Sequence, residues 1–169
     1  QNQALLFDAA AALKTKPGEI RTKLASTLAE MKELRQTIEA YKAKEAAGET
    51  ERFLMGGHEV GGMKVITAVI PGADANKLRQ MGDVLRDKDA SVVAVLASAA
   101  AEKVTFLAVC GKDAVKSGVK AGEIVKHVCT VCGGNGGGKS DSAMGGGKDP
   151  SKMDEALASV ADFVATKVQ

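Results

Sequence analysis

The sequence predicts a mixed α/β (α+β) fold, in which an N-terminal helical arm precedes a small β-sheet packed with helices. Residues 1–54 carry apolar side chains at helical spacing, whereas residues 55–169 alternate short β-branched runs with amphipathic segments. The chain has 169 residues, of which 45% are hydrophobic and 26% charged, which is typical of a folded chain. Only 3% are aromatic, so the core must be built from aliphatic side chains.

The arm, residues 1–54, is expected to contain two helices. Its first segment repeats apolar residues along one helical face: Leu5, Leu6, Ala9, Ala12 and Leu13. Pro17 then suits the first turn of a second helix. From there apolar positions recur in steps of four and three: Ile20, Leu24, Thr27, Met31, Leu34, Ile38 and Tyr41. This heptad seam predicts either a helical hairpin or a short coiled coil that pairs two chains.

The second region, residues 55–169, is expected to fold as a globular domain with the order β-α-β-β-α-loop-α. Asp74 is a suitable N-cap for the first of its helices, and Gly133 stops the second. The expected strands are 63–72, 91–98 and 103–110, and the expected helices are 74–88, 121–132 and 150–168.

Charge and cysteine content limit the function classes. The net charge of +2 excludes a polycation, but residues 112–152 hold seven lysines against four acids. This excess predicts either a modest preference for an anionic ligand there or a solvated loop with scattered lysines. Three cysteines, no secretory signal and no membrane-length apolar run predict a cytoplasmic location and no membrane partner. The chain starts with Gln1 and not with Met, so it is expected to be part of a longer protein.

The CxxC pair, Cys129 and Cys132, is interpreted as buried core. It lies at the C-terminal end of its expected helix, whereas redox pairs gain acidity at a helix N-terminus. Zinc needs further ligands at motif spacing, and Cys110, His58 and the nearby His127 do not provide them. No catalytic triad or carboxylate pair stands out, so we expect neither a metal nor a catalytic residue in this fragment.

Glycines are concentrated near the C-terminus: eight of the 19 lie between Gly133 and Gly147. A flexible linker is disfavoured, because the amphipathic helix that follows can bury its apolar face only by returning to the preceding core. The glycines are therefore expected within the domain, where either a positive φ or a close approach of the backbone to another molecule requires them. Successive N–H groups could form an anion-binding loop, with charges from Lys139 and Lys148 and donors from Asn135 or Ser140. The start of a helix at Pro150 would add a positive dipole end.

Residues 133–140, GGNGGGKS, formally match the nucleotide-binding P-loop pattern. A P-loop follows a strand and opens into a helix, whereas this segment follows an expected helix and precedes SDSAMGGGKDP. Nucleotide hydrolysis is therefore the third-ranked alternative.

The segment VCGGNGGGKSDSAMGGGKDPSKMDEALASVADFV, residues 131–164, resembles the C-terminal domain of alanyl-tRNA synthetases. The upstream VKAGEIVKHV and LRDK segments are also similar to that family, and the resemblance covers most of residues 60–168. The glycine motif is shared more loosely with the nucleic-acid-binding accessory domain of DHH-type phosphoesterases, which is the main alternative. The DHH signature itself is absent from this chain.

The resemblance implies a non-catalytic domain that binds the outer corner of tRNA and links aminoacylation and editing modules. It further implies a parent alanine–tRNA ligase, in which the helical arm contributes to a homodimer. ATP, Mg and Zn would be used by other domains of that parent, and no cofactor by this fragment. The residues expected to contact RNA are Gly133, Gly134, Asn135, Gly136, Gly137, Gly138, Lys139, Ser140, Asp141, Gly145, Gly146, Gly147 and Lys148. Lys139 stands where the family often has Arg, and Lys lacks the bidentate fork of Arg.

Overall fold

The computed structural model describes residues 2–168 and divides into two compact units, 1–44 and 45–169. The division of the chain into domains 1–54 and 55–169, which the sequence suggested, stays a prediction. No helix among residues 2–168 is long and apolar enough to cross a membrane.

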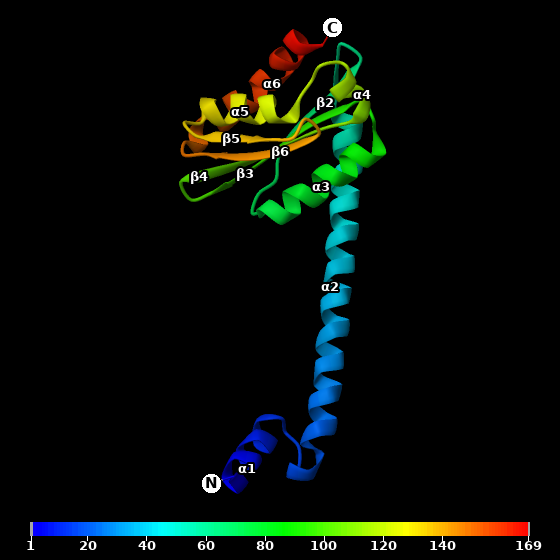
Figure 1. The fold of residues 1–169 in the computed structure, drawn as a ribbon, viewed down its shortest axis with the longest axis vertical. Helices are drawn as coiled ribbons and strands as arrows, with labels where there is room; N and C mark the ends of the chain where they lie inside the picture. Colours follow the sequence, from blue (N-terminus) through cyan, green and yellow to red (C-terminus); the bar gives the residue numbers. More distant parts are fainter. Residues whose placement is uncertain (1, 169) are drawn as a thin grey trace. The chain divides into compact units, whose positions relative to one another are not determined.

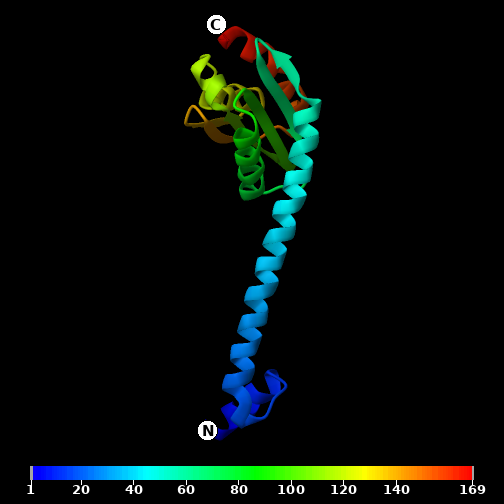
Figure 2. The same ribbon diagram turned by 90° about the vertical axis from the view of Figure 1, so that its right-hand side faces the viewer.

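The N-terminal unit is helical, as predicted. It contains α1 (Asn2–Ala12), η1 (Pro17–Glu19) and the first part of α2 (Ile20–Gly56). Pro17 occupies the first turn of η1, where its missing N–H leaves no bond unmade. Figure 2 shows α2 running without a break, so Thr27 does not interrupt the helix.

The globular unit is built on one six-stranded sheet with the order β1-β2-β3-β4-β6-β5. β2 and β3 are parallel, and every other neighbouring pair is antiparallel. The strands are β1 (His58–Val60), β2 (Met63–Val69), β3 (Val92–Ala100), β4 (Lys103–Cys110), β5 (Asn135–Gly138) and β6 (Ser142–Gly147). The helices of this unit after α2 are α3 (Ala75–Lys88), α4 (Lys112–Lys116), α5 (Ala121–Val131), η2 (Pro150–Lys152) and α6 (Met153–Lys167).

Helices cover both faces of the sheet (Figure 1). α5 and α6 pack on one face over a core that includes Phe106, Val125 and Val160. α3 packs on the other face over a core that includes Leu85 and Leu107. Neighbouring residues of β4, such as Phe106 and Leu107, enter opposite cores because side chains of a strand alternate between its faces.

The predicted fold class is confirmed, and so are the strands that became β2, β3 and β4. Asp74 is the expected N-cap, because its carboxylate accepts a hydrogen bond from the Lys77 N–H at 2.7 Å. Gly133 has φ +70 directly after α5, the left-handed conformation with which helices commonly end. The sequence interpretation missed β1, α4, β5 and β6.

Candidate nucleic-acid interface

The glycine-rich segment forms a β-hairpin, so its interpretation as a loop was wrong. β5 pairs with β6, and β6 pairs with β4 in the middle of the sheet, which leaves β5 as an edge strand. Glycine has low β-propensity and no side chain to create an alternating pattern, so sequence rules do not recognise such strands. The segment is nevertheless part of the regular sheet.

The glycines allow α5 to lie directly on the hairpin. Gly136 and Gly145 face each other across the two strands. A Cβ on Gly145 would lie 2.5 Å from the Gly136 Cα and 2.7 Å from the Cys129 Sγ of α5. A Cβ on Gly134 would overlap the carbonyl oxygen of Gly146. At Gly134, Gly136 and Gly145 the close approach therefore occurs between elements of the same chain and not to another molecule, whereas a Cβ at Gly137 would meet no atom within 4 Å.

The hairpin turn exposes Lys139 and Ser140 to solvent. Its backbone is fixed by the N-terminus of α5: the Ala121 N–H donates to the Ser140 carbonyl at 2.8 Å, and the Gly122 N–H donates to the Lys139 carbonyl at 3.2 Å. These bonds satisfy two of the free amides at the start of that helix. The Lys139 side chain thus extends from a turn with an ordered backbone.

Asp141, at the end of the turn, ties the hairpin to α3. Its Oδ2 accepts a hydrogen bond from Arg86 Nη1 at 3.1 Å, while Arg86 Nη2 donates to Asp83 Oδ1 at 3.1 Å. The Asp141 carbonyl also accepts from the Cys110 N–H at 2.9 Å. Asp141 therefore positions the turn, and Arg86 is a supporting residue that sequence reasoning did not single out. The sequence analysis had mentioned Arg86 only as part of the LRDK segment and had predicted no role for it.

Cationic side chains meet around this turn. A surface cleft of about 1140 Å³ lies between α3, α4 and the turn. Four cationic side chains and two carboxylates line it: Arg86, Lys112, Lys116, Lys139, Asp87 and Asp141. A second cleft shares Arg86, Lys139 and Asp141 with the first. Its lining also includes Arg79, Asp83, Gly137 and Gly138.

Lys148 lies at the opposite end of the hairpin from Lys139. The six residues of β6 separate the two ends, a length on the order of 20 Å. The Lys148 N–H donates to the Cys132 carbonyl at 2.9 Å, which places Lys148 beside the end of α5. The structure therefore splits the predicted site into a turn (Lys139 to Asp141) and a base (Gly133, Gly134, Gly147 and Lys148).

The carboxylate of Asp149 already caps the helix that starts at Pro150. Asp149 Oδ1 accepts a hydrogen bond from the Ser151 N–H at 3.1 Å, and a further bond comes from the Ser151 hydroxyl. These hydrogen bonds lower the pKa of Asp149, so its carboxylate is charged near neutral pH. This charge offsets the positive helix end that the sequence suggested for phosphate binding.

The predicted core placement of the CxxC pair is confirmed. Cys129 and Cys132 are fully buried and free, as is Cys110. Burial raises the pKa of Cys129 to about 11 and that of Cys110 to about 12, so both thiols keep their protons near neutral pH. His127 Nε2 lies 2.9 Å from the Ser159 hydroxyl oxygen. Within the described range, no group of three His, Cys, Asp or Glu residues could hold a metal.

Residues 133–140 lack the surroundings of a nucleotide P-loop. They follow α5 and lead into the strand β6, whereas a P-loop follows a strand and leads into a helix. The amides at the start of α5 donate to the turn carbonyls and do not face an open phosphate site.

The model of the DHHA1 domain family matches residues 62–166, and the chain belongs to this family. The same fold occurs in RecJ from Thermus thermophilus, with a TM-score of 0.59 and 16% identity over 97% of this chain and 24% of that one. Within the family, the chain belongs with the C-Ala domains of alanyl-tRNA synthetases. It is 30% identical to the C-Ala domain from Aquifex aeolicus, with a TM-score of 0.61 over 64% of this chain and 97% of that one.

A curated relative agrees with this assignment. The chain is 44% identical to alanine–tRNA ligase of Geobacillus kaustophilus over 161 residues, which are 95% of this chain and 18% of the relative. The chain thus spans about a fifth of the length of this curated relative.

Proposed function

We propose that this chain is the non-catalytic tRNA-binding domain of an alanine–tRNA ligase. In this role it contacts the outer corner of the tRNA and links the aminoacylation and editing modules of the same polypeptide. ATP, Mg and Zn would serve those other modules, in the cytoplasm. The 44% identity to an alanine–tRNA ligase over 95% of this chain, and the likeness to a C-Ala domain over 64% of it, support this assignment.

The observation that carries the RNA-binding part is the exposed cationic turn on an ordered hairpin. Folded RNA is recognised largely through its backbone and shape, and Lys139 beside two open clefts suits such contacts. With about three phosphate contacts, the slope of log affinity against log salt would be about −2 to −3. Such modest binding suits a module that works while linked to a larger enzyme.

The test is a titration of this chain with alanine tRNA, an unrelated tRNA and a single strand of equal length, at several salt concentrations. Lys139→Glu is expected to weaken tRNA binding about 10-fold, because it removes one phosphate contact and adds a repulsive charge. Lys42→Glu, an exposed lysine of α2, is the matched control. Equal binding to all three nucleic acids, or none at all, would overturn the proposal.

A second candidate is the accessory domain of a DHH-type phosphoesterase, the main alternative from the sequence; RecJ shares the fold of this chain. In that role the same face would present a nucleic acid for hydrolysis by a neighbouring module. The sequence that precedes residue 1 in the parent protein separates the candidates, because only one of them places a DHH signature there.

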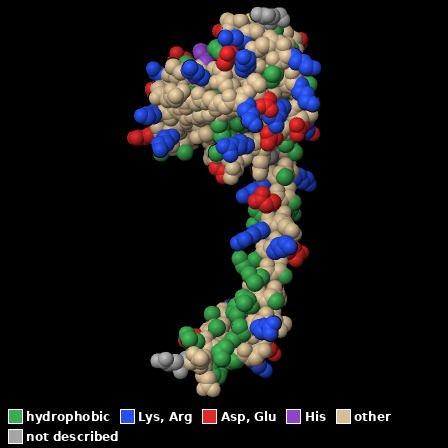
Figure 3. Space-filling model, viewed as in Figure 1, with side chains coloured by type: hydrophobic (Ala, Val, Ile, Leu, Met, Phe, Trp, Pro, Cys, Tyr) green, Lys and Arg blue, Asp and Glu red, His purple; other side chains and the backbone are tan. Residues whose placement is uncertain are grey.

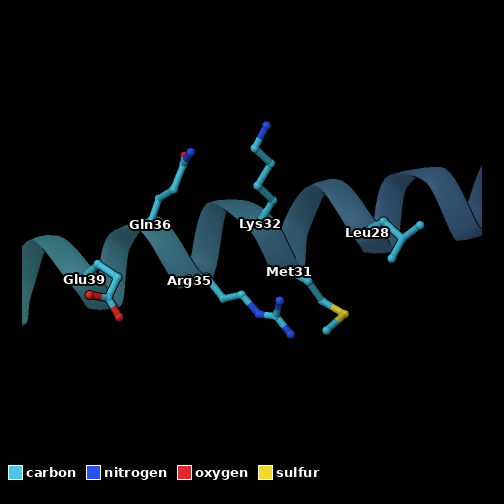
Figure 4. Close-up of a pocket in the computed structure, with 6 residues that line it drawn as sticks. All are labelled: Leu28, Met31, Lys32, Arg35, Gln36 and Glu39. Atoms are coloured by element: carbon cyan, nitrogen blue, oxygen red, sulfur yellow. The ribbon is translucent and has the colours of Figure 1, made fainter. Parts of the chain in front are cut away.

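We further propose that the heptad seam of the arm pairs two chains. Leu34 and Ile38 of α2 are 62% and 51% exposed, and Leu5 and Phe7 of α1 are 67% and 63% exposed. The N-terminal unit therefore exposes large apolar side chains to solvent. Figure 3 shows such side chains gathered along the helical unit. Figure 4 shows Met31 of the seam projecting from one side of α2, beside the charged Arg35, while Lys32 and Gln36 project from the other.

Leu34→Glu with Ile38→Glu is expected to convert a dimer into a monomer, since two charges would enter the apolar seam. Sedimentation equilibrium measures the change. Lys32→Glu with Gln36→Glu, on the other side of the helix, should leave the mass unaltered. A wild-type chain that sediments as a monomer at about 100 μM would contradict the pairing.

A further inference from the structure

We propose that the main phosphate-binding site for folded RNA is the cleft between α4 and the hairpin turn, where Lys112 and Lys116 act together with Lys139. The glycine strands and the hairpin base would then not contact RNA directly. The inference rests on the proposed function and specifies the site: it adds two residues of α4 that the sequence interpretation did not include, and removes Lys148.

The spacing of the lysines supports a shared site. Lys112 and Lys116 are four residues apart in α4, so they lie on the same side of the helix. Both line the cleft that Lys139 and Ser140 enter from the hairpin turn. Lys139, which is distant in sequence from the two lysines of α4, thus lines the same open volume as they do, and an RNA backbone can follow this surface.

These cations are available for a ligand. In the part of the chain that the structure describes, no carboxylate lies within ion-pair distance of Lys112, Lys116 or Lys139. Arg86 differs, because its guanidinium is shared between Asp83 and Asp141. Arg86 therefore fixes the wall of the cleft, while the three lysines remain free to neutralise phosphates.

The framework beneath α4 is rigid. The Gly111 N–H donates to the Val92 carbonyl at 2.8 Å, and the Asp113 N–H donates to the Ala90 carbonyl at 2.9 Å. Ala114 is fully buried, which anchors the short helix to the sheet. Binding would therefore order only lysine side chains and no backbone, which limits its entropic cost.

The cationic surface continues beyond this cleft. An adjoining cleft is lined by Lys116 and Lys120 together with Lys167, which pairs with Glu123 at 3.7 Å. The cations Lys139, Lys112, Lys116 and Lys120 thus border two clefts that share Lys116. A series of cations of this kind suits successive phosphates of an RNA backbone.

The hairpin base is a poorer site. Lys148 and Lys152 are accompanied there by Asp149, Asp154 and Glu155, so the local charges nearly cancel. Burial and, after it, the charges of Asp149 and Glu155 raise the pKa of the Cys132 thiol, so these carboxylates lie near the end of α5. An RNA phosphate would meet repulsion there as well as attraction.

The chemistry of the cleft favours folded RNA over single strands. None of the residues that line the cleft is aromatic, so unpaired bases have no ring on which to stack. Phosphates and ribose hydroxyls displayed by an A-form backbone are the groups that lysines and Ser140 can bind.

The experiment compares two double variants of the full chain in tRNA titrations from about 50 to about 300 mM salt. Lys112→Gln with Lys116→Gln should lower the affinity about 10- to 60-fold near 100 mM salt and reduce the log–log slope by about 2. Lys148→Gln with Lys152→Gln, which removes the same charge at the hairpin base, should leave both quantities within about 2-fold of wild type. Unfolding curves of both variants should match wild type, because all four lysines are exposed.

The outcomes separate this inference from the proposed function. If the wild-type chain binds tRNA and only the base variant weakens binding, the α4 site is refuted while the proposed function stands. Equal losses in both variants would also refute it, since they would indicate a diffuse charge effect. A wild-type chain that binds no tRNA would instead overturn the proposed function. Preferential binding of the single strand would overturn the choice of folded RNA.

Discussion

Replacing Gly145 with alanine is expected to destabilise the globular unit by about 2–3 kcal/mol. The added Cβ would lie 2.5 Å from the Gly136 Cα and 2.9 Å from the Asn135 carbonyl oxygen, both backbone atoms. A flexible side chain could rotate away from such an overlap, but paired strands cannot separate without losing hydrogen bonds. The loss should exceed the gain of about 0.4–1 kcal/mol that alanine brings by restricting the unfolded chain.

Gly137→Ala is the matched control, since a Cβ at Gly137 would meet no atom within 4 Å. Its free energy of unfolding should stay within about 1 kcal/mol of wild type. Urea denaturation followed by circular dichroism measures both variants, and the slope m shows whether the unfolded state has changed. If Gly145→Ala were as stable as Gly137→Ala, α5 could not be packed on the hairpin as the structure has it.

Gly137→Ala and Gly145→Ala together also distinguish an effect on stability from an effect on tRNA binding. Gly137 is exposed on the edge strand and lines the second cleft, whereas Gly145 faces α5. A direct RNA contact by the glycine backbone would make Gly137→Ala weaken tRNA binding without loss of stability. Under the α4 inference, Gly137→Ala should bind normally. The predicted contact of the glycines with RNA can thus be tested residue by residue.

The sequence predicted the elements whose pattern is local. The β-branched run that ends at Pro71 became β2, and the Asp74 cap opens α3 as expected. The hairpin of β5 and β6 could not be predicted in this way, because glycines give no alternation and their partners in α5 are defined only by the fold. The clustering of glycines indicated close backbone approach, but the partner expected from it, another molecule, was wrong at Gly136 and Gly145, which approach each other and α5.

The rest of the candidate site could not be predicted, because its residues are distant in sequence and meet only in the folded chain. Arg86 and Asp141 are 55 residues apart and meet only because α3 and the hairpin turn border the same end of the sheet. Lys112 and Lys116 lie in a five-residue helix too short for a periodic signal. The excess of lysines over acids in residues 112–152 predicted that this surface is positively charged. The sheet topology determines which of these lysines lie close together.

Phe106→Ala is expected to cost about 3–5 kcal/mol of stability, the largest loss among the variants considered. Phe106 is fully buried and has the largest volume of the fully buried side chains in residues 2–168. It lies directly opposite Gly145 in the β4–β6 register and belongs to the core that contains Cys129 and Val125 of α5. Since the facing residue has no side chain, no neighbour on β6 can fill the space that the ring vacates.

Phe106→Leu is the conservative control, and it should cost less than about 1.5 kcal/mol because it keeps most of the apolar volume. Leu107→Ala tests the opposite face, where α3 provides large neighbours; a loss of about 2–5 kcal/mol is expected there. Thermal and urea unfolding of the three variants would rank them. A loss under about 1 kcal/mol for Phe106→Ala would mean that α5 collapses into the vacated space, and that the glycine hairpin does not depend on a ring from β4 for its support.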